Sequence, residues 1–291
     1  MLRGTPAPRP LRQGMLKGWM KLEFFGLIGE KLGHSLSEVI HTRLFEHLSL
    51  PAAYKLMEIP RDRLHEVGQA LRLLTFKGIN VTIPYKELIL PQLDEVDASA
   101  RALMAVNTVK NENGKLTGYN TDVYGLKKML AFHHIDPDGK AAVVLGSGGA
   151  AKAALQALHE LKAARLYVAS RSPEGKTSHL PNTSFIGYDD LESISGGLLL
   201  NATPVGMWPH ADASPVKESV AARFDSVVDT IYNPWETRLL SMANRFNKPC
   251  CNGLYMLVAQ AVRAEEIFWG KSIPQEITDT IYRELHDRLS R

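Results

Sequence analysis

A five-residue apolar run followed at once by a glycine-rich turn most constrains the fold of this chain. The run occupies residues 141–145 (AAVVL), and the turn occupies residues 146–150 (GSGGA). Apolar residues without alternation are typical of a strand buried on both faces of a parallel sheet. Parallel strands are joined by crossover helices, and the small residues after the turn predict such a helix. We therefore expect a doubly wound, Rossmann-type α/β unit around this segment.

The remainder of the chain alternates short strand-like runs with amphipathic stretches, which indicates α/β layering throughout. Upstream of a polar turn segment at 133–140, strands are expected at 24–28, 53–59, 78–83, 106–110 and 115–119, and helices at 37–48, 62–74, 98–103 and 122–132. Downstream, strands are expected at 141–145, 165–169, 197–200 and 227–230, and helices from the glycine turn to about 162, at 256–269 and at 275–289. Asn113-Gly114 should close a hairpin, because this pair tolerates positive φ angles.

These elements predict a two-domain α/β protein. Residues 21–121, completed by the C-terminal helices in 255–291, are expected to form an N-terminal α/β substrate domain, and residues 122–254 a Rossmann-type, doubly wound dinucleotide-binding domain. Residues 1–20 are rich in Arg, Pro and Gly and lack the apolar region of a signal peptide, so we expect a disordered extension. An over-extended start codon, with Met15 or Met20 as the start, and an organelle transit peptide are the alternatives.

The composition excludes several classes of partner. Of the 291 residues, 45% are hydrophobic and 22% are charged, as in a folded protein that can bury two moderate cores. A net charge of +3 without a dense Lys/Arg stripe indicates neither nucleic acid nor a membrane surface as a partner. Cys250 and Cys251 are adjacent, which excludes a disulfide framework and favours the cytoplasm. No metal is expected, and the chain should act as a monomer or a homodimer.

The glycine-rich turn is a candidate cofactor site, because backbone N–H groups at a helix N-terminus attract a pyrophosphate. The expected contacts are made by five small residues: Gly146, Ser147, Gly148, Gly149 and Ala150. At the end of the next strand, Ser170, Arg171 and Ser172 replace the acidic residue that would accept a ribose 2′-hydroxyl. A guanidinium suits a 2′-phosphate and Lys176 lies within reach, so NADP(H) is the expected cofactor. A plain tight turn and a solvated Arg171 are the alternatives.

A lysine closes a second informative segment, residues 78–86 (GINVTIPYK). The apolar, β-prone run is stopped by Pro84, so the amine of Lys86 should stand at the rim of a packed element. Hydride arriving on a ketone carbon leaves a negatively charged oxygen, which an ammonium both stabilises and protonates. A nearby carboxylate would keep the ammonium charged and oriented. The alternative is an ordinary surface lysine.

Eight short motifs follow one another along the chain. They lie at residues 34–37 (HSLS), 80–86 (NVTIPYK), 105–108 (AVNT), 120–122 (NTD), 146–150 (GSGGA), 201–207 (NATPVGM), 229–234 (DTIYNP) and 253–260 (GLYMLVAQ). In this order and spacing they make the chain similar to the shikimate dehydrogenase family from about Phe24 to the C-terminal helices. The resemblance implies NADPH-dependent reduction of 3-dehydroshikimate to shikimate, in the route that makes aromatic precursors.

The resemblance also implies roles for individual residues. Lys86 matches the general acid or base, and Asp122 matches its partner, which also holds a substrate hydroxyl. The other substrate ligands carried over by motif are Ser35, Ser37, Thr82, Asn107, Tyr232 and Gln260. The positions that match the cofactor site, beyond those named above, are Thr203, Thr230 and Gly253. His34 is expected to be structural.

Structural roles are the alternatives for several of these residues. Ser35 and Ser37 flank a predicted helix start, where serine is a favoured N-cap. Asn107 and Asn120 are suited to fixing turns, and Asp122 to stabilising a helix N-terminus. Tyr232 could simply be an aromatic residue at a strand end.

The chain departs from the family pattern in four places, one of which is Lys176, a second basic residue that comes slightly later than the common spacing. Glu38 replaces a proline that is common after the Ser-x-Ser pair, and Ser170 replaces an asparagine that is common before the arginine. Tyr255 replaces a glycine close to the expected nicotinamide, where it would narrow the pocket or alter substrate tolerance. The alternative function is therefore a quinate/shikimate dehydrogenase that uses NAD or NADP.

Two more distant functions fit the sequence less well. A methylenetetrahydrofolate dehydrogenase would not explain Ser35-x-Ser37 together with residues 120–122. A non-catalytic sensor with the same fold should have lost Lys86 or Asp122, and both are present.

Overall fold

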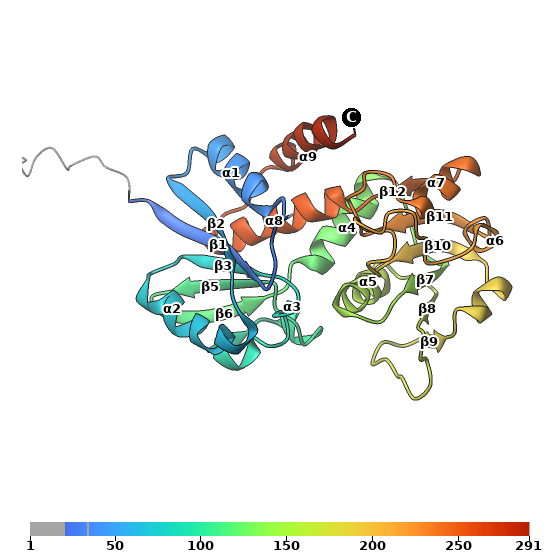
Figure 1. Cartoon of the computed structure of the whole chain (residues 1–291), viewed down its shortest axis with the longest axis horizontal. Coiled ribbons are helices and arrows are strands. Elements are labelled where there is room, and N and C mark those ends of the chain that lie inside the picture. The colour runs from blue at the N-terminus through green and yellow to red at the C-terminus, as the bar shows by residue number, and fades with distance from the viewer. Residues whose placement is uncertain (1–20, 34, 291) are drawn as a thin grey trace, which may run out of the picture.

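The computed structural model describes residues 21–33 and 35–290, which form two α/β units side by side (Figure 1). Each unit is built on a six-stranded sheet. This architecture confirms the expected fold class. The expected extension at residues 1–20 and the structural role expected of His34 lie outside the described residues. Within the described ranges, no helix combines the length and apolar character needed to cross a membrane.

The first sheet has mixed strand directions and the order β2-β1-β3-β5-β6-β4. Its strands are β1 (Glu23–Gly29), β2 (Ala52–Glu58), β3 (Gly78–Val81), β4 (Glu95–Val96), β5 (Thr108–Glu112) and β6 (Lys115–Tyr119). Strand β1 pairs in parallel with β2 and β3, whereas β5 pairs antiparallel with β3 and β6. Asn113 and Gly114 close the predicted hairpin with φ angles of 56° and 89°.

The helices of the first unit are partly as expected. They are α1 (Ser37–Leu48), the 3-10 helix η2 (Arg61–Glu66), α2 (Val67–Leu73), the 3-10 helix η3 (Leu90–Gln92) and α3 (Ala98–Arg101). The prediction of a single helix at 62–74 is wrong, because the 3-10 helix η2 takes the place of its first part and the α-helix α2 begins only at Val67. Leu64, Val67 and Leu71 are buried, and their spacing of three and four residues suits both helix types.

The second sheet is parallel in every strand pair that the structure describes and has the order β12-β11-β10-β7-β8-β9. Its strands are β7 (Ala141–Leu145), β8 (Arg165–Ala169), β9 (Thr183–Ile186), β10 (Gly196–Asn201), β11 (Phe224–Asp229) and β12 (Cys250–Cys251). The helices between them are α5 (Gly149–Glu160), η4 (Asp189–Ser193), α6 (Glu218–Ala221) and α7 (Arg238–Arg245). The strand order reverses between β7 and β10, so a ligand-binding crevice is expected where the glycine turn leaves β7.

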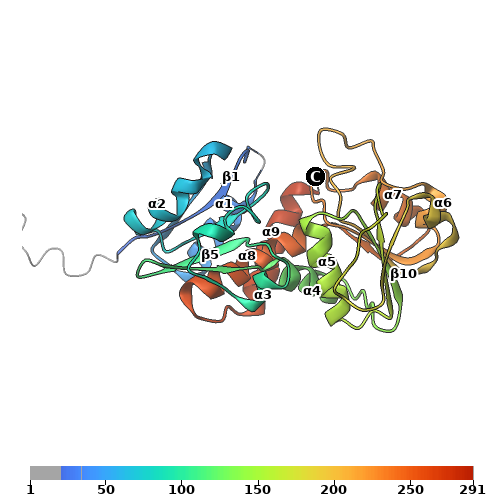
Figure 2. The same ribbon diagram turned by 90° about the horizontal axis from the view of Figure 1, so that it is seen from below.

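Two long helices connect the units. Helices α4 (Asp122–Phe132) and α8 (Leu254–Trp269) lie between the two sheets, and α9 (Gln275–Leu289) packs beside α8 (Figures 1 and 2). The first half of α8 shares a core with α4, α5, β7 and β10. Its last turns reach the first sheet, where Phe268 packs against Phe25 with ring centroids 5.1 Å apart. The C-terminal helices therefore contribute to both cores.

Candidate active site

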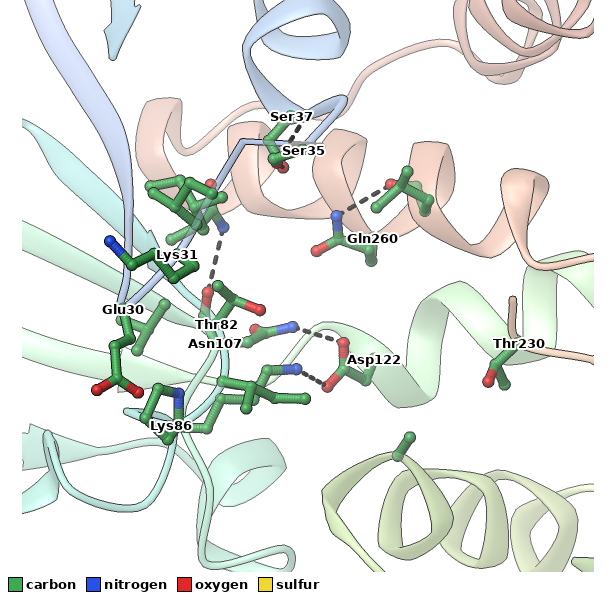
Figure 3. A pocket seen from close by; sticks show the side chains of 18 of the residues that line it. Glu30, Lys31, Ser35, Ser37, Thr82, Lys86, Asn107, Asp122, Thr230 and Gln260 are labelled. Carbon is green, nitrogen blue, oxygen red and sulfur yellow. Dashed lines mark hydrogen bonds and ion pairs between the residues drawn. The ribbon is translucent and has the colours of Figure 1, made fainter. Parts of the chain in front are cut away.

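A cavity of about 760 Å³ lies between the two units. The loops after β1 and β3 line it from the first unit, and the start of α4 and one face of α8 line it from between the units. Five residues line it from the second unit: Ala150, Met207, Thr230, Tyr232 and Gly253. Figure 3 shows the polar side chains of both walls pointing into this space.

Lys86 and Asp122 form an ion pair on the floor of the cavity (Figure 3). Lys86 Nζ lies 2.6 Å from Asp122 Oδ2, and the two side chains are 24% and 12% exposed. The loop that carries Lys86 is anchored by Tyr85, whose fully buried side chain donates a hydrogen bond to the carbonyl of Ile59. Asp122 is the first residue of α4, and its N–H donates to Asn120 Oδ1 at 2.9 Å. The structure thus brings together an ammonium and a carboxylate in a partly desolvated setting, where their attraction is stronger than in water.

The second oxygen of Asp122 is held by Asn107. Asn107 Nδ2 donates to Asp122 Oδ1 at 2.9 Å, and Asn107 Oδ1 accepts from the Thr121 N–H at 2.9 Å. Asn107 therefore lines the cavity and fixes the chain before α4 at the same time. Asn120 donates to the carbonyl of Ala105 and is outside the cavity wall, as expected of a residue that fixes a turn.

The other expected substrate ligands share the cavity wall. They are Ser35, Ser37, Thr82, Tyr232 and Gln260. Burial raises the pKa of Tyr232, so its side chain remains a neutral hydroxyl that can donate. Gln260 Oε1 accepts from Thr121 Oγ1 at 3.2 Å, and its amide nitrogen donates to the Leu257 carbonyl.

The alternative role of the two serines, capping helix α1, is not found in the structure. The N-cap position is Leu36, and no side-chain cap bond is formed there. Instead Ser35 Oγ accepts from the Ser37 N–H at 3.2 Å and lies 3.1 Å from Ser37 Oγ. Both hydroxyls therefore stand together at the start of a helix, a setting that favours a negatively charged group.

The glycine turn after β7 leaves open space for a ligand. Gly146 has a φ of +97°, and a Cβ there would meet the side chain of Thr203. At Gly148 and Gly149, in contrast, a Cβ would meet no heavy atom within 4 Å. Helix α5 starts at Gly149 without a side-chain cap, so its first N–H groups are not covered by a capping side chain. The turn therefore fits a dinucleotide pyrophosphate.

A lysine joins this turn to the end of β8. Lys176 Nζ donates to Ser147 Oγ at 3.0 Å and to Ser170 Oγ at 2.7 Å. Ser172 N–H donates to the same Ser170 hydroxyl at 3.3 Å. Arg171 is exposed, and within the described part of the chain it forms no ion pair. These side chains form a basic group at the carboxyl ends of β7 and β8, where a 2′-phosphate can be bound.

The expected cofactor residues therefore fall into two sets. Ala150, Thr230 and Gly253 share the cavity with Lys86. The remaining ones lie outside the cavity wall, in the turns that follow β7, β8 and β10: Gly146, Ser147, Gly148, Gly149, Ser170, Arg171, Ser172, Lys176 and Thr203. The two sets meet at the carboxyl edge of one parallel sheet.

Tyr255 does not narrow the pocket, which corrects one expectation. Its side chain is 1% exposed, stacks on Phe132 with ring centroids 4.1 Å apart and donates to Asp279 at 2.7 Å. Burial together with Asp279 raises its pKa. The residue belongs to the core between α4, α8 and α9.

Sequence reasoning missed a charged rim on the cavity. Glu30, Lys31 and Arg61 line it, and Arg61 lies 3.5 Å from Glu30. All three residues follow strands β1 and β2 directly or within a few residues, but no motif marked them. Met207 was part of a motif, yet its place in the cavity wall was not expected.

Comparisons with known proteins agree on one family. The model for the shikimate dehydrogenase substrate binding domain matches residues 27–109. The chain is 42% identical over 262 residues to shikimate dehydrogenase (NADP(+)) of Clostridium beijerinckii, which covers 90% of this chain and 97% of that protein. Shikimate dehydrogenase 1 from Peptoclostridium difficile superposes with a TM-score of 0.84 at 44% identity, covering 92% and 99% of the two chains. Shikimate 5-dehydrogenase from Thermus thermophilus, in complex with NADP(H) and shikimate, has a TM-score of 0.79 at 30% identity, covering 90% and 99%.

Proposed function

The chain belongs to the shikimate dehydrogenase family, and we propose that it reduces 3-dehydroshikimate to shikimate with NADPH, which supplies the hydride. The Lys86–Asp122 pair is the observation that carries this proposal. It stands in a cavity that is also lined by Ala150, the last residue of the glycine-rich turn and part of the first turn of α5. The role in the route to aromatic precursors follows from this reaction.

Lys86 is the proposed acid. As negative charge develops on the ketone oxygen, the ammonium stabilises it and gives up a proton, so a hydroxyl forms and a neutral amine remains. In shikimate oxidation the neutral amine takes the hydroxyl proton back. Asp122 keeps the ammonium oriented through Oδ2 and is also proposed to hold a substrate hydroxyl.

The remaining cavity side chains are proposed to bind the substrate. The hydroxyls of Ser35 and Ser37, at the N-terminus of α1, suit the carboxylate. Hydrogen bonds to the ring hydroxyls and the carboxylate are proposed for four further residues that line the same cavity: Thr82, Asn107, Tyr232 and Gln260.

The cofactor is proposed to bind along the carboxyl edge of the second sheet. The space over Gly148 and Gly149 fits the pyrophosphate, and Arg171 with Lys176 fits the 2′-phosphate. Gly146, Ser147, Ala150, Ser170, Ser172 and Thr203 complete this part of the proposed site. Thr230 and Gly253 are proposed to lie near the nicotinamide, since they share the cavity with Lys86.

Further proposals concern organisation and environment. Residues 21–121 with 255–291 are proposed as the substrate domain and 122–254 as the NADP domain, which is supported by the division of strands between the two sheets. A cytoplasmic location is supported by the free thiols of Cys250 and Cys251, whose pKa values are raised by burial. A monomer or a homodimer is proposed, to be decided by light scattering after size exclusion.

Absorbance of the reduced nicotinamide tests the function. Shikimate and quinate are each offered with NADP⁺ and NAD⁺ to wild type, Lys86→Ala and Lys77→Ala. Lys77 is the control, because it immediately precedes the first residue of β3, whereas Lys86 follows the last. We expect rapid reduction of NADP⁺ with shikimate, a loss of roughly 10²–10⁴-fold in Lys86→Ala and no large change in Lys77→Ala. Comparable rates with quinate or NAD⁺ would indicate the broader quinate/shikimate activity. Absence of turnover with every pair would refute the proposal.

A further inference from the structure

The carboxylate of Asp122 is the end of a buried hydrogen-bond chain. A carboxylate can only accept, so Asn107 must present its Nδ2 to Asp122 Oδ1, where the distance is 2.9 Å. This turns Asn107 Oδ1 toward Thr108, whose hydroxyl donates to it at 3.0 Å. The Thr108 oxygen in turn accepts from Asn80 Nδ2 at 3.1 Å.

This hydrogen-bond chain continues to strand β2. Asn80 has its Nδ2 engaged with Thr108, so its Oδ1 faces Tyr54, and the Tyr54 hydroxyl donates to it at 2.8 Å. Complete burial raises the pKa of Tyr54 well above its ordinary value, so this hydroxyl keeps its proton. Every donor therefore points the same way, from Tyr54 through Asn80, Thr108 and Asn107 to Asp122. Counted over whole residues, Asp122 is 8% exposed and the other four are at most 5% exposed.

At the other end of the hydrogen-bond chain, two helices hold the ring of Tyr54. The His41 ring of α1 stacks on the Tyr54 ring with centroids 4.0 Å apart and an interplanar angle of 8°. His41 Nδ1 lies 2.5 Å from Glu265 Oε1 of α8, and Glu265 Oε2 accepts from Trp269 at 2.8 Å. The Tyr54 ring therefore has little freedom to rotate.

We propose that Tyr54, Asn80 and Thr108 are positioning residues for proton transfer, which fix the orientation of the Asp122 carboxylate through Asn107. This inference rests on the proposed function, because it assigns the three residues to the Lys86–Asp122 site. Of the three, Asn80 lines the cavity. Tyr54 and Thr108 lie outside the cavity wall and act through other residues. If this hydrogen-bond chain is broken at Thr108, Asn107 Oδ1 keeps only its hydrogen bonds from Thr121, so the amide and the Asp122 carboxylate that it contacts are held less firmly.

The first test does not depend on activity. In ¹⁵N-labelled protein, the side-chain amide of Asn107 is assigned by its loss in Asn107→Asp, and its hydrogen exchange is measured. Exchange should become faster in Tyr54→Phe and Thr108→Val, and stay as in wild type in Thr108→Ser, which keeps the hydroxyl. Tyr255→Phe is the matched control, since it removes a buried tyrosine hydroxyl outside the chain. Unchanged exchange in Tyr54→Phe and Thr108→Val would overturn the proposal.

The second test is kinetic. In Tyr54→Phe and Thr108→Val, kcat should fall roughly tenfold or more, with a smaller change in KM. Thr108→Ser should behave as wild type, and the double variant should cost little more than either single one. Wild-type kcat in both Tyr54→Phe and Thr108→Val would overturn the proposal. An inactive wild type would refute the proposed function and leave the exchange result to decide the positioning role.

Discussion

Asp122 divides its two carboxylate oxygens between two partners, with Lys86 at 2.6 Å from Oδ2 and Asn107 on Oδ1. Lys86 follows β3, whereas Asp122 opens α4, so the pair joins two elements that are 36 residues apart. Since Asn107 occupies Oδ1, the carboxylate presents Oδ2 to Lys86 alone among the described side chains. The direction of the ammonium is thereby set before any substrate arrives.

Asp122→Asn should therefore remove activity while leaving the fold in place. The amide keeps the size of the carboxyl group but no longer attracts the ammonium. We expect kcat to fall by roughly 10²–10⁴-fold in both directions of the reaction. Steady-state rates with shikimate and thermal unfolding of the variant check this, and near wild-type turnover would contradict the role given to Asp122. Asp190→Asn, on a distant 3-10 helix, is a suitable control.

Gly148→Ala should separate cofactor binding from folding. A Cβ at this position meets no heavy atom within 4 Å, so Tm should stay close to that of wild type. The methyl group would instead occupy the space proposed for the pyrophosphate, and the Kd for NADP⁺ should rise at least tenfold, about 1.4 kcal/mol. Fluorescence titration with NADP⁺ measures this. Gly253→Ala is the contrasting variant, because its Cβ would collide with the Thr230 carbonyl and should lower Tm.

Arg171→Ala should weaken NADP⁺ more than NAD⁺. Hydrogen bonds to a charged partner contribute about 1.5–3 kcal/mol each, so the KM for NADP⁺ should rise roughly 10- to 100-fold. The KM for NAD⁺, which lacks the 2′-phosphate, should hardly change. Arg165→Ala, at the opposite end of β8, serves as the control. Equal effects on both cofactors would show that Arg171 does not bind the 2′-phosphate.

Asp229 should make stability depend on pH. Burial raises the pKa of Asp229 from 3.8 to about 6, against the hydrogen bonds from Ile231, Thr237 and Asn201 that lower it. Between pH 4 and pH 6 the folded state therefore keeps a proton on Asp229 that the unfolded state has lost. The contribution of this proton to the free energy of unfolding is complete below pH 4 and is lost as the pH rises through 6. The loss amounts to roughly 3 kcal/mol.

The neutral variant Asp229→Asn should avoid this loss. Its Tm relative to wild type should increase between pH 4 and pH 7, as measured by thermal unfolding in matched buffers. Asp225→Asn, an exposed position on the same strand, should show no such trend. A pH-independent difference between Asp229→Asn and wild type would count against a neutral Asp229 below pH 6.

The parts of the fold with a strong local pattern were predictable. β7 and β8 have the expected bounds, and α9 matches the expected helix 275–289, because their apolar spacing leaves one choice. β9 and β12 were missed. β12 has only two residues and exists through its pairing with β11, and β9 is largely half-buried and pairs only with β8. Whether such an edge strand forms depends on its pairing with the neighbouring strand more than on its own sequence.

The site was predictable in residue type more than in geometry. The motifs indicated Lys86 and Asp122, but the tertiary structure decides that they meet: α4 begins just after β6 and packs against α8 and α5. The direction of Tyr255 was readable, since Tyr255, Val258 and Val262 follow helical spacing on the buried face of α8. Gln260 lies on the face toward the cavity. Of the charged rim, Glu30 and Lys31 lie in the loop after β1 and Arg61 begins the 3-10 helix η2, so no periodic pattern marks these residues.

Helix α8 also decides how this protein can be taken apart. A Cβ at Gly78 would collide with the ring of Phe268, so the first sheet is shaped to receive the end of α8. Residues 21–121 produced alone would leave the apolar face around Phe25 uncovered. A foreign cofactor module has to be grafted into the interior of the chain, with one junction before β7 and a second before α8, and not fused to the end of a free-standing N-terminal fragment.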